Sequence, residues 1–184
     1  MSMMKNYSLS NEVKKVANGK LLVELYSNNW KMRIAYILGF DGKYLVYAAV
    51  SPQVTLEEVA IIPYSSVIMI KTSGLYLDKF AKKMINDDPY QEAKKLVSEV
   101  KNPTFDGFIS AFTDKKKLVE IDYDSSDRFG CRVIASDETS VVIDEYYSEQ
   151  SVCYARAIIQ KDRINRIAIN VDWVNVTEEF LGDK

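Results

Sequence analysis

Six side chains towards the C-terminal end of the sequence have the chemistry of a nucleic-acid site. Arginine and lysine neutralise phosphates, and tyrosine rings stack on bases. The candidate residues are Arg132, Tyr154, Arg156, Lys161, Arg163 and Arg166. The cations among them could instead form ordinary surface pairs with nearby carboxylates, which is the commoner arrangement. Those carboxylates are Asp122, Asp124, Asp127, Asp162 and Asp172.

Catalytic chemistry has little support in the sequence. There is no histidine, which removes Ser-His-Asp and Cys-His catalysis and histidine-ligated zinc. The acidic pairs Glu57-Glu58 and Asp144-Glu145 are adjacent residues, and neighbours in a strand point to opposite faces, so they cannot readily share a substrate atom. We interpret both pairs as solvated surface. The sequence therefore predicts a non-enzymatic protein with no catalytic residues, no cofactor site and no metal site.

The two cysteines, Cys131 and Cys153, are fewer than a secreted disulfide framework usually carries, and they lack the CxxC spacing of a zinc site. Their apolar neighbours predict reduced thiols that pack as small apolar residues on neighbouring strands. Residues 1–20 are too polar for a signal-peptide core, and no apolar run approaches the roughly 20 residues of a membrane helix. We therefore expect a cytoplasmic protein that has no membrane partner.

Composition and charge fit an ordinary globular protein. The chain has 184 residues, of which 47% are hydrophobic and 27% charged, which is enough apolar material for one domain or two small ones. The net charge is −2, and residues 115–184 hold 10 basic and 14 acidic side chains, a net charge of −4. Long-range attraction to nucleic acid is therefore not expected from this charge balance.

One packing pattern occurs twice in the chain. Leu22-Val23-Glu24 recurs as Leu118-Val119-Glu120, an offset of 118 minus 22, or 96. The offset carries apolar residues onto apolar residues along each copy and becomes 97 near the end, where Ile62 matches Ile159. One inserted residue in a loop explains that change. Internal repetition of this kind predicts two copies of one structural unit.

Periodicity and turn residues predict a short helix and then five short strands in each copy. In the first copy a helix around residues 9–17 is followed by strands at 20–27, 30–38, 43–50, 59–62 and 66–71, with a tight turn at Asp41-Gly42. In the second copy a helix at 105–112, capped by Thr104, is followed by strands at 117–123, 129–135, 140–147, 151–159 and 164–170. Helices at 75–86 and 88–101 connect the copies, and a last strand and helical turn are expected at 173–181.

A short helix followed by five bent strands resembles the Sm-like small barrel, a member of the SH3-like barrels. In the second copy Phe129-Gly130, then Asp137, then residues 141–144 look like the first Sm signature, in which a bending glycine precedes an acidic turn and an apolar strand. The resemblance implies barrels that assemble into rings through strand pairing and often bind RNA. The RNA-contacting residues of that family do not carry over, because Ser140 stands near the place of its asparagine and the loop 161–163 lacks glycine and histidine.

We therefore predict a mainly β protein with two tandem Sm-like five-stranded barrels: a first unit at 1–73, a helical linker at 74–103 and a second unit at 104–184. Small barrels expose edge strands that another chain can extend. The expected function is a protein-interaction or self-assembly module, with a protein partner or a homodimer. The alternative is RNA binding through the six residues of the second unit. A small-molecule sensor or enzyme between the barrels is the third and weakest hypothesis.

Overall fold

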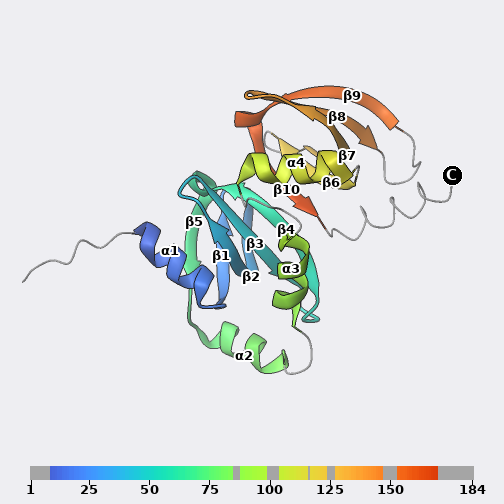
Figure 1. Cartoon of the computed structure of the whole chain (residues 1–184). Coiled ribbons are helices and arrows are strands. Elements are labelled where there is room, and N and C mark those ends of the chain that lie inside the picture. Colours follow the sequence, from blue (N-terminus) through green and yellow to red (C-terminus); the bar gives the residue numbers. More distant parts are fainter. Residues whose placement is uncertain are drawn as a thin grey trace, which may run out of the picture.

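The structure, a computed structural model, describes residues 9–84, 88–98, 104–115, 117–123, 127–146 and 153–169. The described chain is mainly β (Figure 1). Its strands are β1 (Leu22–Ser27), β2 (Trp30–Phe40), β3 (Tyr44–Val50), β4 (Leu56–Pro63), β5 (Val67–Lys71), β6 (Leu118–Tyr123), β7 (Asp127–Ser136), β8 (Ser140–Tyr146), β9 (Cys153–Gln160) and β10 (Ile164–Ile169). Its helices are α1 (Leu9–Asn18), α2 (Leu75–Lys83), α3 (Pro89–Ser98) and α4 (Phe105–Lys115), with short 3₁₀ turns η1 (Tyr64–Ser66) and η2 (Lys161–Arg163). The strand and helix expected at 173–181 lie outside the described residues.

The strands form one antiparallel sheet in the order β5-β1-β2-β3-β4-β10-β6-β7-β8-β9. The prediction of two separate closed barrels therefore needs correction, because the sheet is continuous and open. The strand that joins the halves is β10, which pairs with β6 of its own half and also with β4 of the first half. Local periodicity cannot reveal this pairing, since β4 and β10 lie about a hundred residues apart in the sequence. The prediction of a mainly β fold is confirmed.

The internal repeat is confirmed by the strand registers. Val23 pairs with Ala35 as Val119 pairs with Cys131, and both β2 and β7 have a bulge at the equivalent place, next to Ile37 and Val133. The remaining matched pairs are Leu45–Ile62 with Val141–Ile159, and Leu25–Ile70 with Ile121–Ile167. Irregular positions recur along with regular ones. The two halves are therefore copies of one five-stranded unit.

Short polar residues set the turns and helix starts that position these strands. The Asp41 carboxylate accepts hydrogen bonds from the backbone N–H groups of Lys43 and Tyr44, and Gly42 between them has a positive φ of 99°. Asp137, at the equivalent place in the second half, accepts from Thr139 and Ser140 in the same way. These backbone N–H groups hold the pKa of Asp137 below its ordinary value.

The helix starts follow the sequence signals, and one helix end differs from them. The Thr104 hydroxyl accepts from the N–H of Gly107 at the start of α4, as predicted, and the Asp88 carboxylate accepts from the N–H of Gln91 at the start of α3. Asn18-Gly19 at the end of α1 is a sequence that commonly supplies the left-handed residue after a helix, but here that residue is Lys20, with φ 52°. None of the described helices is long and apolar enough to cross a membrane.

The two larger hydrophobic cores among the described residues lie on opposite faces of the sheet. Along β3, Leu45 and Tyr47 belong to the core under α1, whereas Val46 and Ala48 belong to the core under α3 and α4. This alternation follows from the two-residue period of a strand. The outward face of the first half is therefore covered by the core of the second half. That arrangement leaves β5 and β9 as the outermost strands of the described sheet.

Candidate functional site

The outer edge of the first half is β5, and it carries a groove. In the described part of the chain β5 has a hydrogen-bonded neighbour, β1, on one side alone. Ile68 and Met69 on this strand are exposed. A groove of about 420 Å³ runs between β5 and α1. Its walls are Glu12, Val13, Val16, Tyr64, Val67, Ile68, Met69, Ile70 and Thr72.

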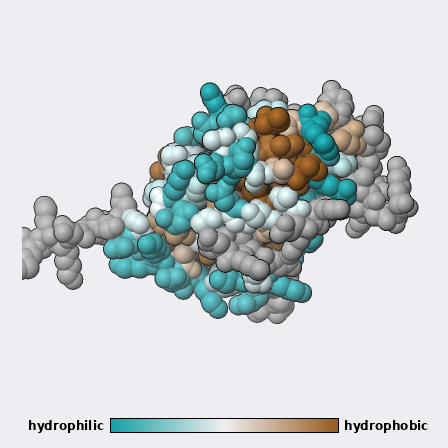
Figure 2. All heavy atoms as spheres, turned by 45° about the horizontal axis from the view of Figure 1, so that its top comes forward, coloured by the Kyte–Doolittle hydropathy of each residue, from teal (hydrophilic) through white to brown (hydrophobic). Residues whose placement is uncertain are grey.

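The outer edge of the second half is β9, and it carries an exposed apolar patch. Ile158 on β9 is 70% exposed and lies opposite Val142 on β8. Ile134, in the bulge of β7, is also exposed, and Ala135 next to it pairs with Val142. Figure 2 shows an apolar patch, bordered by hydrophilic side chains, over this upper part of the molecule. Exposed apolar side chains gathered at an open sheet edge indicate a contact surface.

Two of the predicted nucleic-acid residues border this patch. The Arg156 guanidinium donates from Nε and Nη2 to the Asp144 carboxylate at 2.6 and 2.9 Å. This contact lowers the pKa of Asp144 and raises the pKa of Arg156. Arg132 on β7 lies opposite Asp144 on β8, and the Arg132 guanidinium is 5.4 Å from the centre of the Tyr146 ring. One carboxylate thus shares its charge with two arginines, which reduces their attraction for phosphate.

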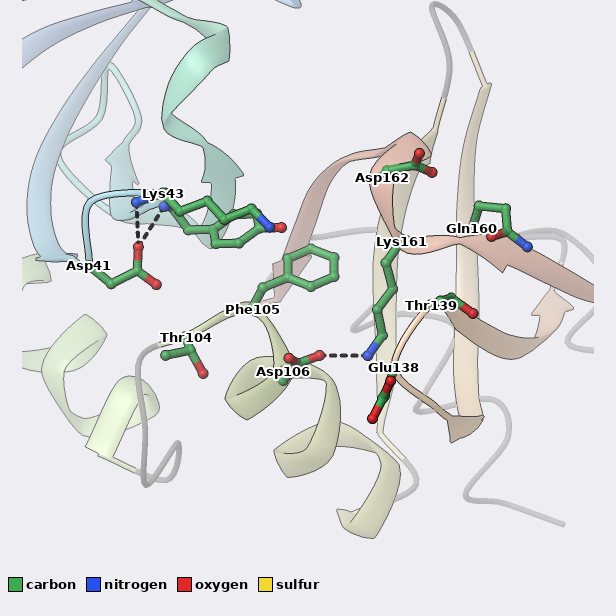
Figure 3. Close-up of a pocket in the computed structure, with 11 residues that line it drawn as sticks. Asp41, Lys43, Thr104, Phe105, Asp106, Glu138, Thr139, Gln160, Lys161 and Asp162 are labelled. Atoms are coloured by element: carbon green, nitrogen blue, oxygen red, sulfur yellow. Dashed lines mark hydrogen bonds and ion pairs between the residues drawn. The ribbon is translucent and has the colours of Figure 1, made fainter.

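Lys161 lies in a different place, in a polar cleft of about 480 Å³ between the halves (Figure 3). Its ammonium group is 2.6 Å from the Asp106 carboxylate and also contacts the carbonyl oxygen of Asp137. The cleft is lined by Asp41, Lys43, Tyr44, Thr104, Phe105, Asp106, Glu138, Thr139, Gln160, Lys161 and Asp162. Both signs of charge are present around it. The cleft therefore offers no surface of one charge to a polyanion.

The cleft is also where the halves are held together by aromatic contact. The ring of Tyr44 on β3 stacks on Phe105 of α4, with centroids 4.9 Å apart and planes 21° apart. The Lys43 ammonium lies over the Tyr44 ring, 5.2 Å from its centre. Among the described residues no group of three or more cysteine, aspartate and glutamate side chains could hold a metal ion. The arrangement thus serves docking of the two halves.

Arg166 is buried at the joint between the halves, with 1% of its side chain exposed. Its guanidinium donates to Glu58 on β4 and to Glu120 and Asp122 on β6. Glu58 in turn accepts a 2.6 Å hydrogen bond from the Tyr47 hydroxyl. Burial first, and the negative charge of Glu58 next, raise the pKa of Tyr47 well above its ordinary value. The predicted pairing with Asp122 exists, but in the interior rather than at the surface.

Glu58 extends this network to Arg33 on β2. The Arg33 guanidinium lies 3.2 Å from both Glu57 and Glu58. Burial works against the charge of Arg33, but the neighbouring groups Tyr47, Glu58, Glu57 and Asp122 outweigh that effect, and the pKa of Arg33 is raised. The sequence-based assignment of Glu58 and Glu145 to solvated surface was wrong, because both side chains are buried. Carboxylates that alternate with apolar residues on β6, Glu120 and Asp122, were the signal that could have found this network.

The other two candidates add little to a common site. Arg163 is exposed on η2, and the side chain of Tyr154 lies outside the described residues. The structure therefore brings Arg132 and Arg156 together, places Lys161 in the cleft and places Arg166 in the interior. RNA binding by the six residues stays a prediction.

The cysteines differ from each other. Cys131 on β7 is buried, and burial raises the pKa of its thiol. Cys153 on β9 is exposed, and both thiols are free. The strand β8 lies between them, so the expectation of two buried thiols on neighbouring strands was wrong for Cys153 and for the strand order.

Comparisons of the chain with protein-family models, with curated proteins and with solved structures found no match.

Proposed function

We propose that this chain is a non-enzymatic protein-interaction module that assembles by adding strands at the edges of its sheet. The observation that carries the proposal is that the two outermost strands of the described sheet, β5 and β9, each have a strand neighbour on one side alone among the described residues and lie beside exposed apolar side chains. An open strand presents unpaired backbone N–H and C=O groups, and a second chain can satisfy them. The groove along β5 and the patch along β9 add apolar area to that contact.

Neither edge has much of the protection that proteins use against strand pairing. Charged side chains and proline on an edge strand commonly provide it. The run Val67 to Ile70 on β5 contains no charge and no proline, and its single cation, Lys71, lies at the end of the strand. On β9 the one charged residue, Arg156, is neutralised by Asp144. These edges are therefore suited to pairing.

The finer description of each half as an Sm-like unit is part of this proposal. Each half has a helix followed by five strands, which is the topology that suggested the resemblance, and a short 3₁₀ turn precedes the last strand of each half. Nucleic-acid binding has no comparable support, since the predicted cations are paired, dispersed or buried. Two free thiols agree with an intracellular, reducing compartment, so the cytoplasm remains the proposed location.

The test is the molar mass of the native chain by light scattering over about 1 to 100 µM, because the extent of association depends on protomer concentration. The mass should rise with concentration. Ile158→Asp should lower it, because an unpaired charge would be buried in the contact. Leu75→Asp is the matched control, since Leu75 is 82% exposed on α2, outside both edge surfaces. A monomer throughout this range, or an equal effect of the two variants, would overturn the proposal.

A further inference from the structure

The two open strands are the copies of two strands that pair with each other inside the chain. An offset of 97 carries β4 onto β9 and β5 onto β10. Within each half, the last strand follows a 3₁₀ turn and pairs with the first strand in the same register, with a bulge at the same place. The joint between the halves is the pairing of β4 with β10. Each end of the sheet therefore carries one half of a joint that the chain already makes once.

We infer that a second copy of this chain adds head to tail, with β5 of one copy beside β9 of the next in the register of the internal joint. The inference rests on the proposed function and names its partner. Inside the chain Ile167 pairs with Ile61, Ala168 with Ala60 and Ile169 with Val59. Subtracting and adding 97 gives the expected pairs between copies. They are Ile70 with Ile158, Lys71 with Ala157, and Thr72 with Arg156.

The patch on β9 is the uncovered copy of a surface that is covered at the internal joint. Ile61 is fully buried, whereas its copy Ile158 is 70% exposed. Val46 and Leu38 also pack in the core shared by the two halves, and their copies by the offset of 96 are Val142 and Ile134. Phe105, Phe108 and Ile109 of α4 belong to the core that covers them. In the assembly, the patch on β9 would be covered in the same way by α1 of the copy that contributes β5.

The groove beside β5 is the empty copy of a space that is filled at the internal joint. Val13 of α1 and Ile70 of β5 line the groove, and their copies are Ile109 of α4 and Ile167 of β10. Those copies are buried in one core cluster together with Ile61 of β4. The side chain that would enter the groove is therefore Ile158 of the next copy. The open groove beside β5 and the exposed side chain of Ile158 on β9 lie at matching places, so both surfaces support the same joint between copies.

The charged groups near the edges are compatible with this contact. The Lys71 ammonium group lies 3.2 Å from the Glu24 carboxylate, and Arg156 pairs with Asp144. Each of these cations therefore has a carboxylate partner within its own chain. The internal ion pair of Arg166 with Glu58 has no counterpart, because the copies at the free ends are Met69 and Ala155. No charge is left unpaired by this difference. Without that ion pair we expect the joint between copies to be more easily opened than the joint inside the chain.

Such a contact is heterologous, since it uses two different surfaces. Each copy then keeps one free surface after the first contact, so further copies can add until the assembly closes. This distinguishes head-to-tail assembly from a twofold dimer made through β5 alone or through β9 alone.

The test is a charge reversal across the expected pair of Thr72 and Arg156. Thr72 is exposed in the single chain, so Thr72→Lys should fold normally. It should weaken association at least about tenfold, because it places two cations opposite each other. Adding Arg156→Glu together with Asp144→Asn to the same chain should restore association, because the introduced ammonium group would then face a carboxylate that has no second carboxylate opposite it. Sedimentation velocity gives the association constants, and circular dichroism confirms that each variant is folded.

The possible outcomes separate the inference from the proposed function. Association that survives Thr72→Lys, or that is lost and not restored by Arg156→Glu with Asp144→Asn, would overturn the head-to-tail joint and leave assembly through another edge pairing. A native chain that stays monomeric would overturn both. As a second measurement, Ile158→Asp and Thr72→Lys chains are mixed, each with one surface intact. Head-to-tail pairing predicts monomers apart and a one-to-one complex together, and a mixture that stays monomeric contradicts it.

Discussion

Ile61 and Ile158 occupy the same place in the two halves of the sheet, yet Ile61 is fully buried and Ile158 is 70% exposed. Ile61 lies opposite Ile167 on β10, which covers it from the second half. Ile158 lies on the outermost strand of the sheet. The difference in exposure between these two residues shows that the joint between the halves buries the side chain of Ile61.

Alanine at these two positions should separate folding from association. Ile61→Ala should lower the free energy of unfolding by about 2 to 5 kcal/mol, because it leaves a cavity in a packed core. Ile158→Ala should change the stability of the single chain by less than about 0.5 kcal/mol, because the side chain is mostly in water. Urea unfolding at low protein concentration measures both. Equal losses would show that the described burial is wrong.

Arg166 should be essential for the joint between the halves. Arg166→Met removes the partner of three buried or nearly buried carboxylates and should cost about 3 to 5 kcal/mol of stability, since it leaves buried charge uncompensated. The matched control is Arg156→Met, which removes an arginine whose side chain is 63% exposed and should leave the unfolding midpoint nearly unchanged. Similar midpoints for the two variants would contradict the buried network.

Glu145 should make the protein less stable as the pH rises. This side chain is buried, and burial raises its pKa above the ordinary value of 4.5. A raised carboxyl pKa means that the folded state binds the proton more tightly, so its contribution is complete below about pH 4.5 and is lost as the pH rises through the folded pKa. Glu145→Gln should therefore be increasingly more stable than the native chain from about pH 4.5 upwards. A stability difference that does not change with pH would contradict this account.

The two thiols should react at very different rates. Cys153 is exposed, whereas Cys131 is buried with a raised pKa, so little of the reactive thiolate is available at neutral pH. A maleimide reagent should modify one thiol in the native chain and two after unfolding. Mass spectrometry identifies the site. Rapid labelling of Cys131 in the folded protein would show that the second half of the sheet is open to solvent.

The strands, the helix starts and the internal repeat could be predicted from the sequence, because each depends on local periodicity or on a local hydrogen bond. The turn at Asp41-Gly42 and the cap at Thr104 are examples. The joint of β4 with β10 could not, since pairing between distant strands leaves no local pattern. Two separate barrels were expected for this reason, and a continuous sheet is found.

The candidate site was predicted only in outline. Edge strands were expected to mediate association, but the sequence does not show which strands lie at the edges. Arg166 and Glu58 were assigned to the surface, because the sequence shows the charge of each residue but not that the two are buried together as an ion pair. The groove along β5 depends on how α1 packs, which periodicity alone does not specify.

The most direct measurement of the assembly is a disulfide trap between copies. In a background with Cys131→Ala and Cys153→Ser, one chain carries Thr72→Cys and another carries Arg156→Cys. Directly opposed residues of antiparallel strands have Cα atoms about 4.5 to 5.5 Å apart, which is within the range that a disulfide spans. Mild oxidation of the mixture should give a covalent dimer that joins one chain of each kind. Links only between identical chains, or no link at a concentration where the native protein associates, would contradict the head-to-tail joint.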